Sequence, residues 1–116
     1  MRQEDSLQVT VADYLRRALP AYIPWSHFPA GEHRHARVGA KLKRFGLNPG
    51  WPDILILWKQ FVICIELKSD KGRLTQSQKD FAIQAKELGH PYIVARDLDA
   101  VEAALKQHGV PLRGNL

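Results

Sequence analysis

The sequence predicts an α/β fold in which helices flank a mixed β-sheet. Two short apolar stretches, 54–58 and 61–67, are separated by only two residues, and this spacing predicts an antiparallel hairpin. A third apolar stretch, 91–95, follows a helical pattern, so that strand, helix and strand form a crossover unit with a parallel pair. The 116 residues are one domain's length, and we expect residues 1–116 to form a single domain.

The first predicted element is a helix over residues 4–19. Its apolar side chains recur at helical spacing, and the pattern stops at Pro20. Glu4 lies on the same stripe as Val11 and Leu15, which predicts that it points towards the end of the sheet. The helix dipole also favours an acidic residue in a first turn, so a site role and a structural role both stay open for Glu4.

The segment of residues 20–52 is rich in Pro, Gly, His and aromatic residues. We expect an edge strand near Tyr22–Phe28 and a short basic helix from about Arg34 to Phe45, capped by Gly46. The run Asn-Pro-Gly-Trp-Pro at 48–52 then forms a stiff lead into the first central strand. Three aromatic residues offer surfaces for stacking on unpaired bases, although core packing is the commoner role: Trp25, Phe28 and Trp51.

The second half of the chain continues with a polar loop at 69–73. Thr75 and Gln78 then have the spacing of a helix capping box, and the helix runs to about Leu88. A last helix, from about Leu98 to His108, follows the third apolar stretch.

The hairpin is expected to gather charged residues at its open end. With the turn centred between residues 59 and 60, Asp53 lies opposite Glu66, and Lys68 lies on the same face, roughly 7 Å further along. Two opposed carboxylates repel one another, so we expect a positive charge between them. Two acids and a lysine on one side of a sheet are the parts of a divalent-metal phosphodiesterase site.

Two structural alternatives bear on this site. Glu-x-Lys is a frequent pattern on solvated strands, but here both faces of the second strand are apolar, as in a sheet covered on two sides. Charges at the mouth of such strands are usually paired or bound to metal. Lys59-Gln60 is a poor type I′ turn, and a one-residue bulge there would move Asp53 and Glu66 to opposite faces.

Three polar residues after Lys68 have two interpretations each. Gln78 either only satisfies a backbone donor as part of the capping box or, because it lies on the sheet-facing side of its helix, joins the site. Lys71 and Arg73 are either phosphate contacts beside Lys68 or solvated charges.

Basic residues are concentrated in one segment of the chain. The formal net charge is +5, and the segment from Ser26 to Gly46 holds five Lys and Arg residues against Glu32 alone. This distribution predicts a polyanionic partner. The predicted DNA-binding residues are Arg34, Arg37, Lys41, Lys43 and Arg44 in this segment, together with Lys71 and Arg73 in the later loop.

The single cysteine, Cys64, excludes an internal disulfide and a cysteine-rich zinc site. It lies in the middle of a predicted strand among apolar neighbours, which is typical of a small core residue rather than a nucleophile. The sequence contains no long apolar segment and no signal-peptide pattern, so we expect a soluble cytoplasmic protein of a bacterium or a phage-infected host cell.

The order helix, strand, strand, strand, helix, strand, with Pro-Asp opening one strand and Glu-x-Lys closing the next, resembles the restriction-endonuclease-like PD-(D/E)xK nucleases. Within that group the sequence is similar to the virus-type replication-repair nuclease (VRR-NUC) domain, in the short stand-alone form carried by phages. The motifs are individually degenerate but fairly specific in their order and spacing, and they span nearly the whole chain. They are Glu4 with Leu7-Gln8, Val11 and Tyr14-Leu15; Gly50-Trp51-Pro52-Asp53; Glu66-Leu67-Lys68; Gly72-Arg73-Leu74-Thr75 with Gln78; and Gly89.

The resemblance implies a restriction-endonuclease-like core and a set of roles for the site residues. Glu4, Asp53 and Glu66 would hold Mg²⁺ or Mn²⁺, with the backbone carbonyl of Leu67 as a further ligand. Lys68 would orient or activate the attacking water or stabilise charge on the phosphate, and Gln78 would assist in positioning. The number of metal ions, one or two, stays open.

The resemblance also implies a partner and an assembly. Related stand-alone domains tend to work as homodimers on branched DNA such as four-way (Holliday) junctions, and a domain with one site needs a second copy to cut two strands symmetrically. A homodimeric, structure-selective endodeoxyribonuclease is therefore the leading hypothesis.

Three other functions share much of this sequence pattern. A restriction-type endonuclease would combine the same site with base-reading loops. A non-catalytic nucleic-acid-binding module would keep the acids and the lysine as a buried ion-pair network. RNA as the substrate stays open, since nothing in the sequence indicates how a 2′-hydroxyl would be treated.

Overall fold

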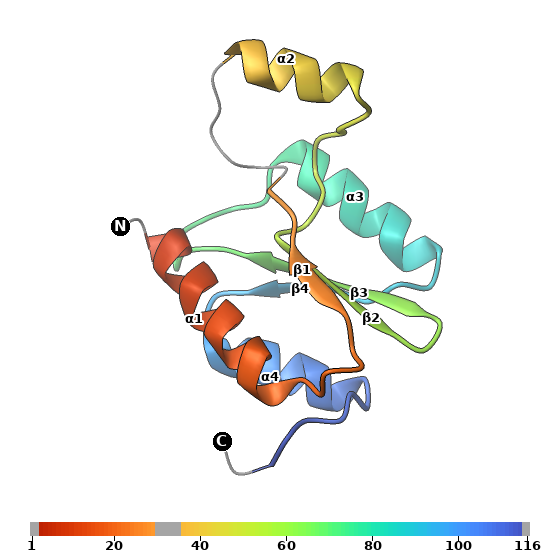
Figure 1. Cartoon of the computed structure of the whole chain (residues 1–116). Helices are drawn as coiled ribbons and strands as arrows, with labels where there is room; N and C mark the ends of the chain where they lie inside the picture. Colours follow the sequence, from red (N-terminus) through yellow and green to blue (C-terminus); the bar gives the residue numbers. More distant parts are fainter. Residues whose placement is uncertain (1–2, 30–35, 115–116) are drawn as a thin grey trace.

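The computed structural model describes residues 3–29 and 36–114, and a four-stranded mixed sheet lies at its centre (Figure 1). The strands lie in the order β1-β2-β3-β4, as predicted for an α/β fold with a mixed sheet. The elements along the chain are α1 (Gln3–Ala18), β1 (Trp25–His27), α2 (Ala36–Arg44), β2 (Ile54–Trp58), β3 (Phe61–Leu67), α3 (Gln76–Glu87), β4 (Tyr92–Ala95) and α4 (Leu98–Gln107).

The β2–β3 hairpin has the register that the sequence predicted. Trp58 pairs with Phe61 and Ile54 pairs with Ile65, without a bulge between them. The turn forms because Lys59 adopts a positive φ of 55°, a conformation that its residue type does not favour. The same register, continued by one residue, sets Asp53 opposite Glu66.

Helices cover the sheet on both faces, as the apolar strands require. The core cluster on one face joins α1 and α4 to the sheet through residues such as Leu15, Ile65 and Leu105, all fully buried. On the other face, a smaller cluster places α3 over Cys64 and Tyr92. β3 and β4 are parallel neighbours, and α3 is their crossover helix (Figure 1). Cys64 is buried in this cluster, which confirms its interpretation as a core residue.

The segment between α1 and β2 departs from the predicted bounds. β1 is only three residues long, shorter than the predicted strand, and begins after Pro24, whose ring leaves no backbone N–H to extend the ladder. The basic helix α2 buries none of its residues, and it projects from the body of the molecule (Figure 1). The predicted start of this helix, at Arg34, lies outside the described residues.

The helix starts in the second half follow the predicted chemistry. Thr75 and Gln78 form a complete capping box at the start of α3. Asp97 caps α4, where its carboxylate accepts from the amide of Ala100 at 2.8 Å.

Within residues 3–29 and 36–114, no helix has the length and apolar character needed to cross a membrane.

Candidate active site

Asp53 is held in place from two strands. Its Oδ2 accepts a hydrogen bond from the amide of Leu67 at 2.7 Å, which ties the aspartate to the end of β3. Its backbone carbonyl accepts from the amide of Phe28 at 2.7 Å and lies 2.9 Å from Nδ1 of His27, both at the end of β1. Pro52, which is fully buried, fixes the backbone just before it. The rigid lead predicted for this acid is therefore present.

The lead into Asp53 is also fixed against α3. Gly50 has a φ of +92°, and a Cβ atom at this position would lie 2.3 Å from the carbonyl oxygen of Ser77. Only glycine allows this approach of two backbones. The segment before Asp53 and the first turn of α3 therefore form one packed unit.

Glu66 is the buried member of the pair, with 3% of its surface exposed. Its Oε2 accepts from Nε2 of Gln78 at 3.0 Å and lies 3.7 Å from the ammonium of Lys68. Its Oε1 is buried and has no hydrogen-bond partner. A buried carboxylate oxygen without a partner carries a large desolvation cost, which a bound cation would offset.

Burial dominates the electrostatics of the two acids. It raises the pKa of Glu66 to about 8; the negative charge of Asp53 adds to the rise, and Lys68 opposes it. Burial also raises the pKa of Asp53, against the lowering effect of the hydrogen bond from Leu67. The two carboxyl groups also influence each other: their interaction adds to the rise in the pKa of Glu66 and opposes the rise in the pKa of Asp53.

This donor set fits a hard divalent cation. Mg²⁺ and Mn²⁺ prefer oxygen ligands, and Mg²⁺ commonly uses one or two carboxylates with water completing its shell. Among the described residues, no group of three or more His, Cys, Asp and Glu side chains is placed to hold a metal ion. The candidate site therefore rests on the two carboxylates of Asp53 and Glu66, a number that suits Mg²⁺ when water supplies its other ligands.

Glu4 lies beside this pair rather than in its hydrogen bonds. Its Oε1 accepts from the amide of Ser69 at 3.4 Å, directly after Lys68, and its charge adds to the raised pKa of Glu66. The first turn of α1 thus lies at the same end of the sheet, as the helical stripe predicted. The roles of Glu4 and of the Leu67 carbonyl as metal ligands stay predictions.

Gln78 takes both of the roles that the sequence left open. Its Oε1 accepts from the amide of Thr75 at 2.9 Å, as a capping box requires, and its Nε2 donates to Glu66. The two ends of one amide thus connect the start of α3 to the buried carboxylate.

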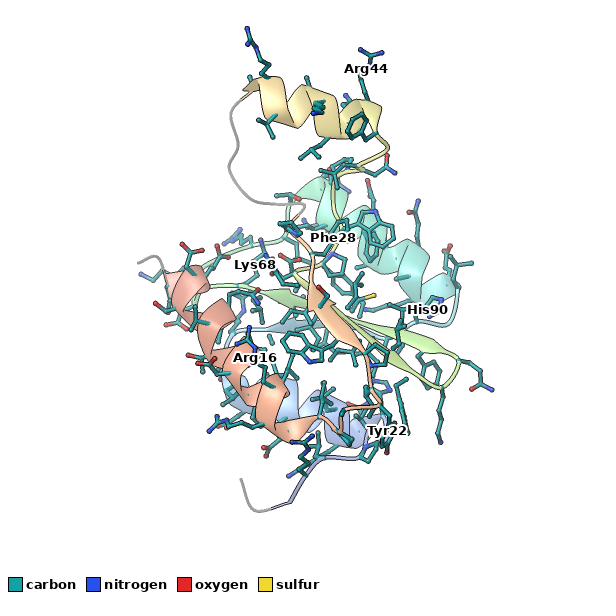
Figure 2. The ribbon with its side chains drawn as sticks, in the orientation of Figure 1. Arg16, Tyr22, Phe28, Arg44, Lys68 and His90 are labelled. Carbon is teal, nitrogen blue, oxygen red and sulfur yellow. The ribbon has the colours of Figure 1, made fainter. Side chains whose placement is uncertain are left out.

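Figure 2 places Lys68 at the end of the sheet near the first turns of α1.

The predicted DNA-binding residues fall into two places. Arg34 lies outside the described residues, and the other four of its segment lie on α2: Arg37, Lys41, Lys43 and Arg44. Lys71 and Arg73 are exposed in the loop that follows Lys68. The DNA-binding roles of all these residues stay predictions.

The aromatic residues near the site form a packed series. The ring of Trp51 lies 5.5 Å from that of Phe28 and 4.9 Å from that of Phe81, measured between centroids. Trp25 has the guanidinium of Arg16 over its ring at 5.9 Å. These contacts show the packing role of the aromatic residues, and base stacking stays a prediction.

Two residues near the site were not among the predicted site residues, His27 and Arg96. Arg96 follows β4, and its guanidinium donates to backbone carbonyls of the loop after Lys68. A usable signal was present, because the carboxyl ends of the parallel strands β3 and β4 meet at one edge of the sheet. His27 gave no such signal, since its contact depends on how the edge strand pairs.

Comparison with known proteins supports the same fold. No family profile and no curated protein matches the sequence. A solved structure described as a VRR_NUC domain protein matches with a TM-score of 0.68 and 27% sequence identity, over 90% of this chain and 85% of the other.

The sheet, its helices and the acidic end of the hairpin define a restriction-endonuclease-like α/β domain. Within that class the chain is similar to a VRR_NUC domain protein over most of its length, in agreement with the resemblance that the order of its motifs indicated. This similarity supports a nuclease-type function.

Proposed function

We propose that the protein is a metal-dependent, structure-selective endonuclease that hydrolyses phosphodiester bonds in branched DNA such as Holliday junctions. The observation that carries this proposal is the buried pair Asp53 and Glu66, with an oxygen of Glu66 lacking a partner and Lys68 at 3.7 Å. A stability-driven ion pair would leave no such oxygen unsatisfied. The VRR-NUC resemblance supports the same reaction class.

The residues have separate tasks in this proposal. Asp53 and Glu66 would hold Mg²⁺ or Mn²⁺, joined by Glu4 and the carbonyl of Leu67. When bound, such an ion polarises the phosphate and lowers the pKa of coordinated water. The hydrogen bond from the amide of Leu67 orients the carboxylate of Asp53, and the hydrogen bond from Gln78 orients that of Glu66. Lys68 places a positive charge where the phosphate gains negative charge.

DNA is proposed to run from the site towards α2. Lys71 and Arg73 are exposed in the loop that follows Lys68, and α2, which carries basic residues, projects from the body of the domain (Figure 1). Contacts of this kind neutralise phosphates and position a duplex without reading its bases. Such a track suits an enzyme that selects DNA by shape, and this supports branched rather than sequence-specific substrates.

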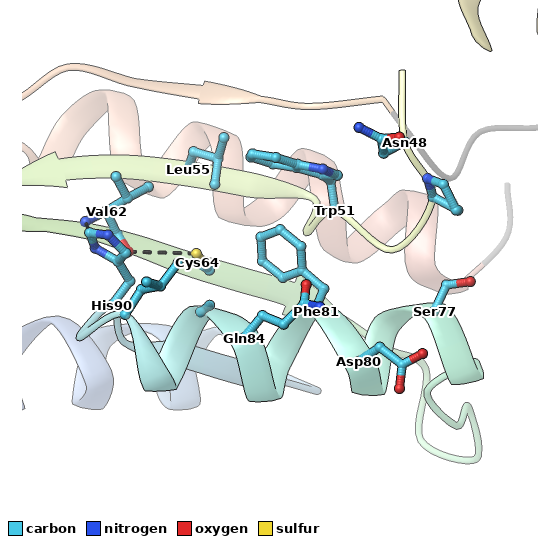
Figure 3. A pocket seen from close by; sticks show the side chains of 13 residues that line it. Asn48, Trp51, Leu55, Val62, Cys64, Ser77, Asp80, Phe81, Gln84 and His90 are labelled. Atoms are coloured by element: carbon cyan, nitrogen blue, oxygen red, sulfur yellow. Dashed lines mark hydrogen bonds between the residues drawn. The ribbon is translucent and has the colours of Figure 1, made fainter. Parts of the chain in front are cut away.

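A second copy of the chain is proposed to cover an apolar cleft beside the site. The cleft, about 600 Å³ in volume, lies between α3 and the β2–β3 hairpin (Figure 3). Its lining includes Leu55, Val62 and Phe81, and Leu88 at its rim is 76% exposed. Exposed apolar surface beside a hollow favours association.

The same cleft lies on the face of the sheet that carries the acids. Leu55 follows Asp53 by two residues and Cys64 precedes Glu66 by two, so the cleft and the site share one face. A symmetric pairing through this surface would bring two sites to the same side of the dimer, as paired cuts in a junction require.

The decisive experiment compares the wild type with Lys68→Ala on labelled junction, flap, single-stranded and duplex DNA. Each reaction is run with Mg²⁺, with Mn²⁺ and with EDTA. Metal-dependent cuts that disappear in the variant are expected, with paired cuts on the junction. Binding without any scission would contradict the proposal and favour a non-catalytic DNA-binding module.

A further inference from the structure

Arg96, the residue directly after β4, holds the loop of residues 69–72 that follows Lys68. Nη1 of Arg96 donates to the carbonyls of Ser69 at 2.5 Å and Gly72 at 2.7 Å, with the carbonyl of Asp70 at 3.4 Å. Three carbonyl dipoles thus converge on one guanidinium group. Charge-assisted hydrogen bonds of this length are among the stronger ones in proteins.

The other side of the same loop faces α1. The amide of Ser69 donates to Glu4 at 3.4 Å, and the amide of Asp70 donates to Oε1 of Gln3 at 3.3 Å. The loop therefore connects the first turn of α1, through its N–H groups, to the end of β4, through its carbonyls.

The loop also approaches Glu4 at Gly72. A Cβ atom at this position would lie 2.9 Å from Oγ of Ser69, closer than side chains normally come, and 3.4 Å from Oε1 of Glu4, an ordinary contact distance. The absence of a side chain at Gly72 therefore lets the loop fold back on Ser69 while it lies beside Glu4.

We propose that Arg96 is a positioning residue of the active site, which acts by holding the 69–72 loop so that Glu4 and Lys68 keep their places beside Asp53 and Glu66. This inference rests on the proposed nuclease function. Arg96 lies in no motif of the sequence analysis, and its guanidinium contacts the loop backbone rather than the carboxylates. Its effect is expected on turnover and loop order.

The test compares Arg96→Ala and Arg96→Lys with the wild type and with Arg17→Ala. Arg17 is a matched control, because it is exposed and also donates to a backbone carbonyl, that of Asp13, at 3.3 Å. Three quantities are measured: kcat and KM on junction DNA at saturating Mg²⁺, the melting temperature, and hydrogen exchange of the amides of Ser69 and Asp70.

For Arg96→Ala we expect kcat to fall about 10- to 100-fold with KM unchanged, because outer positioning contacts typically have effects of this size. Exchange at Ser69 and Asp70 is expected to accelerate. Arg96→Lys should lie between the two, since an ammonium replaces the planar fork only in part, and added guanidinium ion should restore part of the activity of Arg96→Ala. Arg17→Ala should match the wild type.

A double variant adds a second line to the test. If Arg96 acts through the contact of the loop with Glu4, the losses of Arg96→Ala and Glu4→Gln should not multiply when combined. Fully multiplicative losses would show that the two residues act separately and would overturn the proposal.

Other outcomes also decide the matter. A raised KM with unchanged kcat and a shallower salt dependence would make Arg96 a phosphate contact instead. A lower melting temperature with normal kcat in the folded fraction would reduce it to a structural residue. If the wild type cuts no DNA, the proposed function fails, but the exchange experiment still tests whether Arg96 holds the 69–72 loop. Unchanged exchange in Arg96→Ala would show that it does not.

Discussion

At the scale of single residues, the site holds two acids in surroundings that disfavour their ionised forms. Glu66 is buried beside Asp53, and a pKa of about 8 shows how strongly its surroundings oppose ionisation. Lys68 and Gln78 offset only part of this cost. Stability and function are therefore expected to respond in opposite directions when these acids are made neutral.

The first prediction concerns cleavage. Asp53→Asn, Glu66→Gln and Lys68→Ala should each abolish metal-dependent scission and leave DNA affinity within about threefold of the wild type, since phosphate contacts supply most of the binding. Affinity is measured by fluorescence anisotropy in EDTA and cleavage on labelled junctions. Asp99→Asn, an exposed acid of α4, is the control and should cut normally. Normal activity in any of the three variants would refute the site.

The second prediction concerns stability against pH without metal. The folded pKa of Glu66, about 8, lies above the ordinary value of 4.5, so between these values the folded state holds a proton that the unfolded state has lost. Stability should therefore be highest below about pH 4.5 as far as this group is concerned, and fall as pH rises to 8, by on the order of 1–3 kcal/mol.

Urea unfolding in EDTA between pH 5 and pH 8.5 measures this effect. Glu66→Gln should flatten the profile and be more stable than the wild type at pH 8.5, because the buried charge is gone. An equally steep fall in the variant would assign the pH dependence to other groups. Mg²⁺ should stabilise the wild type more than the variant at the higher pH.

At the scale of elements, α2 differs from the rest of the domain. The other three helices bury apolar residues on the sheet, whereas α2 buries none. It carries the exposed Val38 together with its basic residues, and Phe45, directly after its end, is exposed as well. Its basic character and its position beyond the site suit a DNA-contacting arm more than a part of the core.

The third prediction concerns this arm. Lys43→Ala and Arg37→Ala should each weaken DNA binding several-fold and reduce the slope of log K against log salt by about 1, as expected for one lost phosphate contact. Lys106→Ala, on α4 and paired with Glu102, is the control and should leave the slope unchanged. A slope that stays the same in all three variants would place the DNA track elsewhere.

Most of the elements and the acidic pair followed from the sequence for a simple physical reason. Only two residues separate the strands of the hairpin, and a turn centred between them sets the register, so the pairing of Asp53 with Glu66 could be predicted. The double role of Gln78 could not, because spacing places a side chain near two partners without showing that both ends of its amide are used.

The remaining features depend on tertiary detail. The hydrogen bonds from Arg96 to the 69–72 loop require the particular shape of that loop, and no sequence periodicity predicts this shape. The short β1 depends on where Pro24 ends the ladder. The exposure of α2 could not be predicted either, because an amphipathic pattern shows which side of a helix is apolar but not whether anything packs against it.

At the scale of the whole molecule, the sheet is covered unequally. α1 and α4 form a continuous core on one face, while α3 leaves an apolar cleft on the other, between itself and the β2–β3 hairpin. The proposed dimer would complete this thinner face.

The fourth prediction tests the dimer. Leu88→Glu should convert the protein from dimer to monomer at micromolar concentration, because a charge at the rim of the cleft would be desolvated by pairing. Tyr22→Glu is the matched control: its side chain is 70% exposed, against 76% for Leu88, but it lies outside the cleft. Light scattering after gel filtration measures the mass, and a monomeric wild type would contradict the assignment.

The close contact between Gly50 and Ser77 has a consequence for synthesis of the protein on the ribosome. The segment that aims Asp53 is seated on the first turn of α3, and Glu66 takes a hydrogen bond from the same turn. Both acids therefore leave the ribosome before α3 (Gln76–Glu87), the helix that orders them. We expect the proposed site to be assembled only after that helix has emerged and packed against the hairpin, so that a partly synthesised chain would hold the acids without their final arrangement.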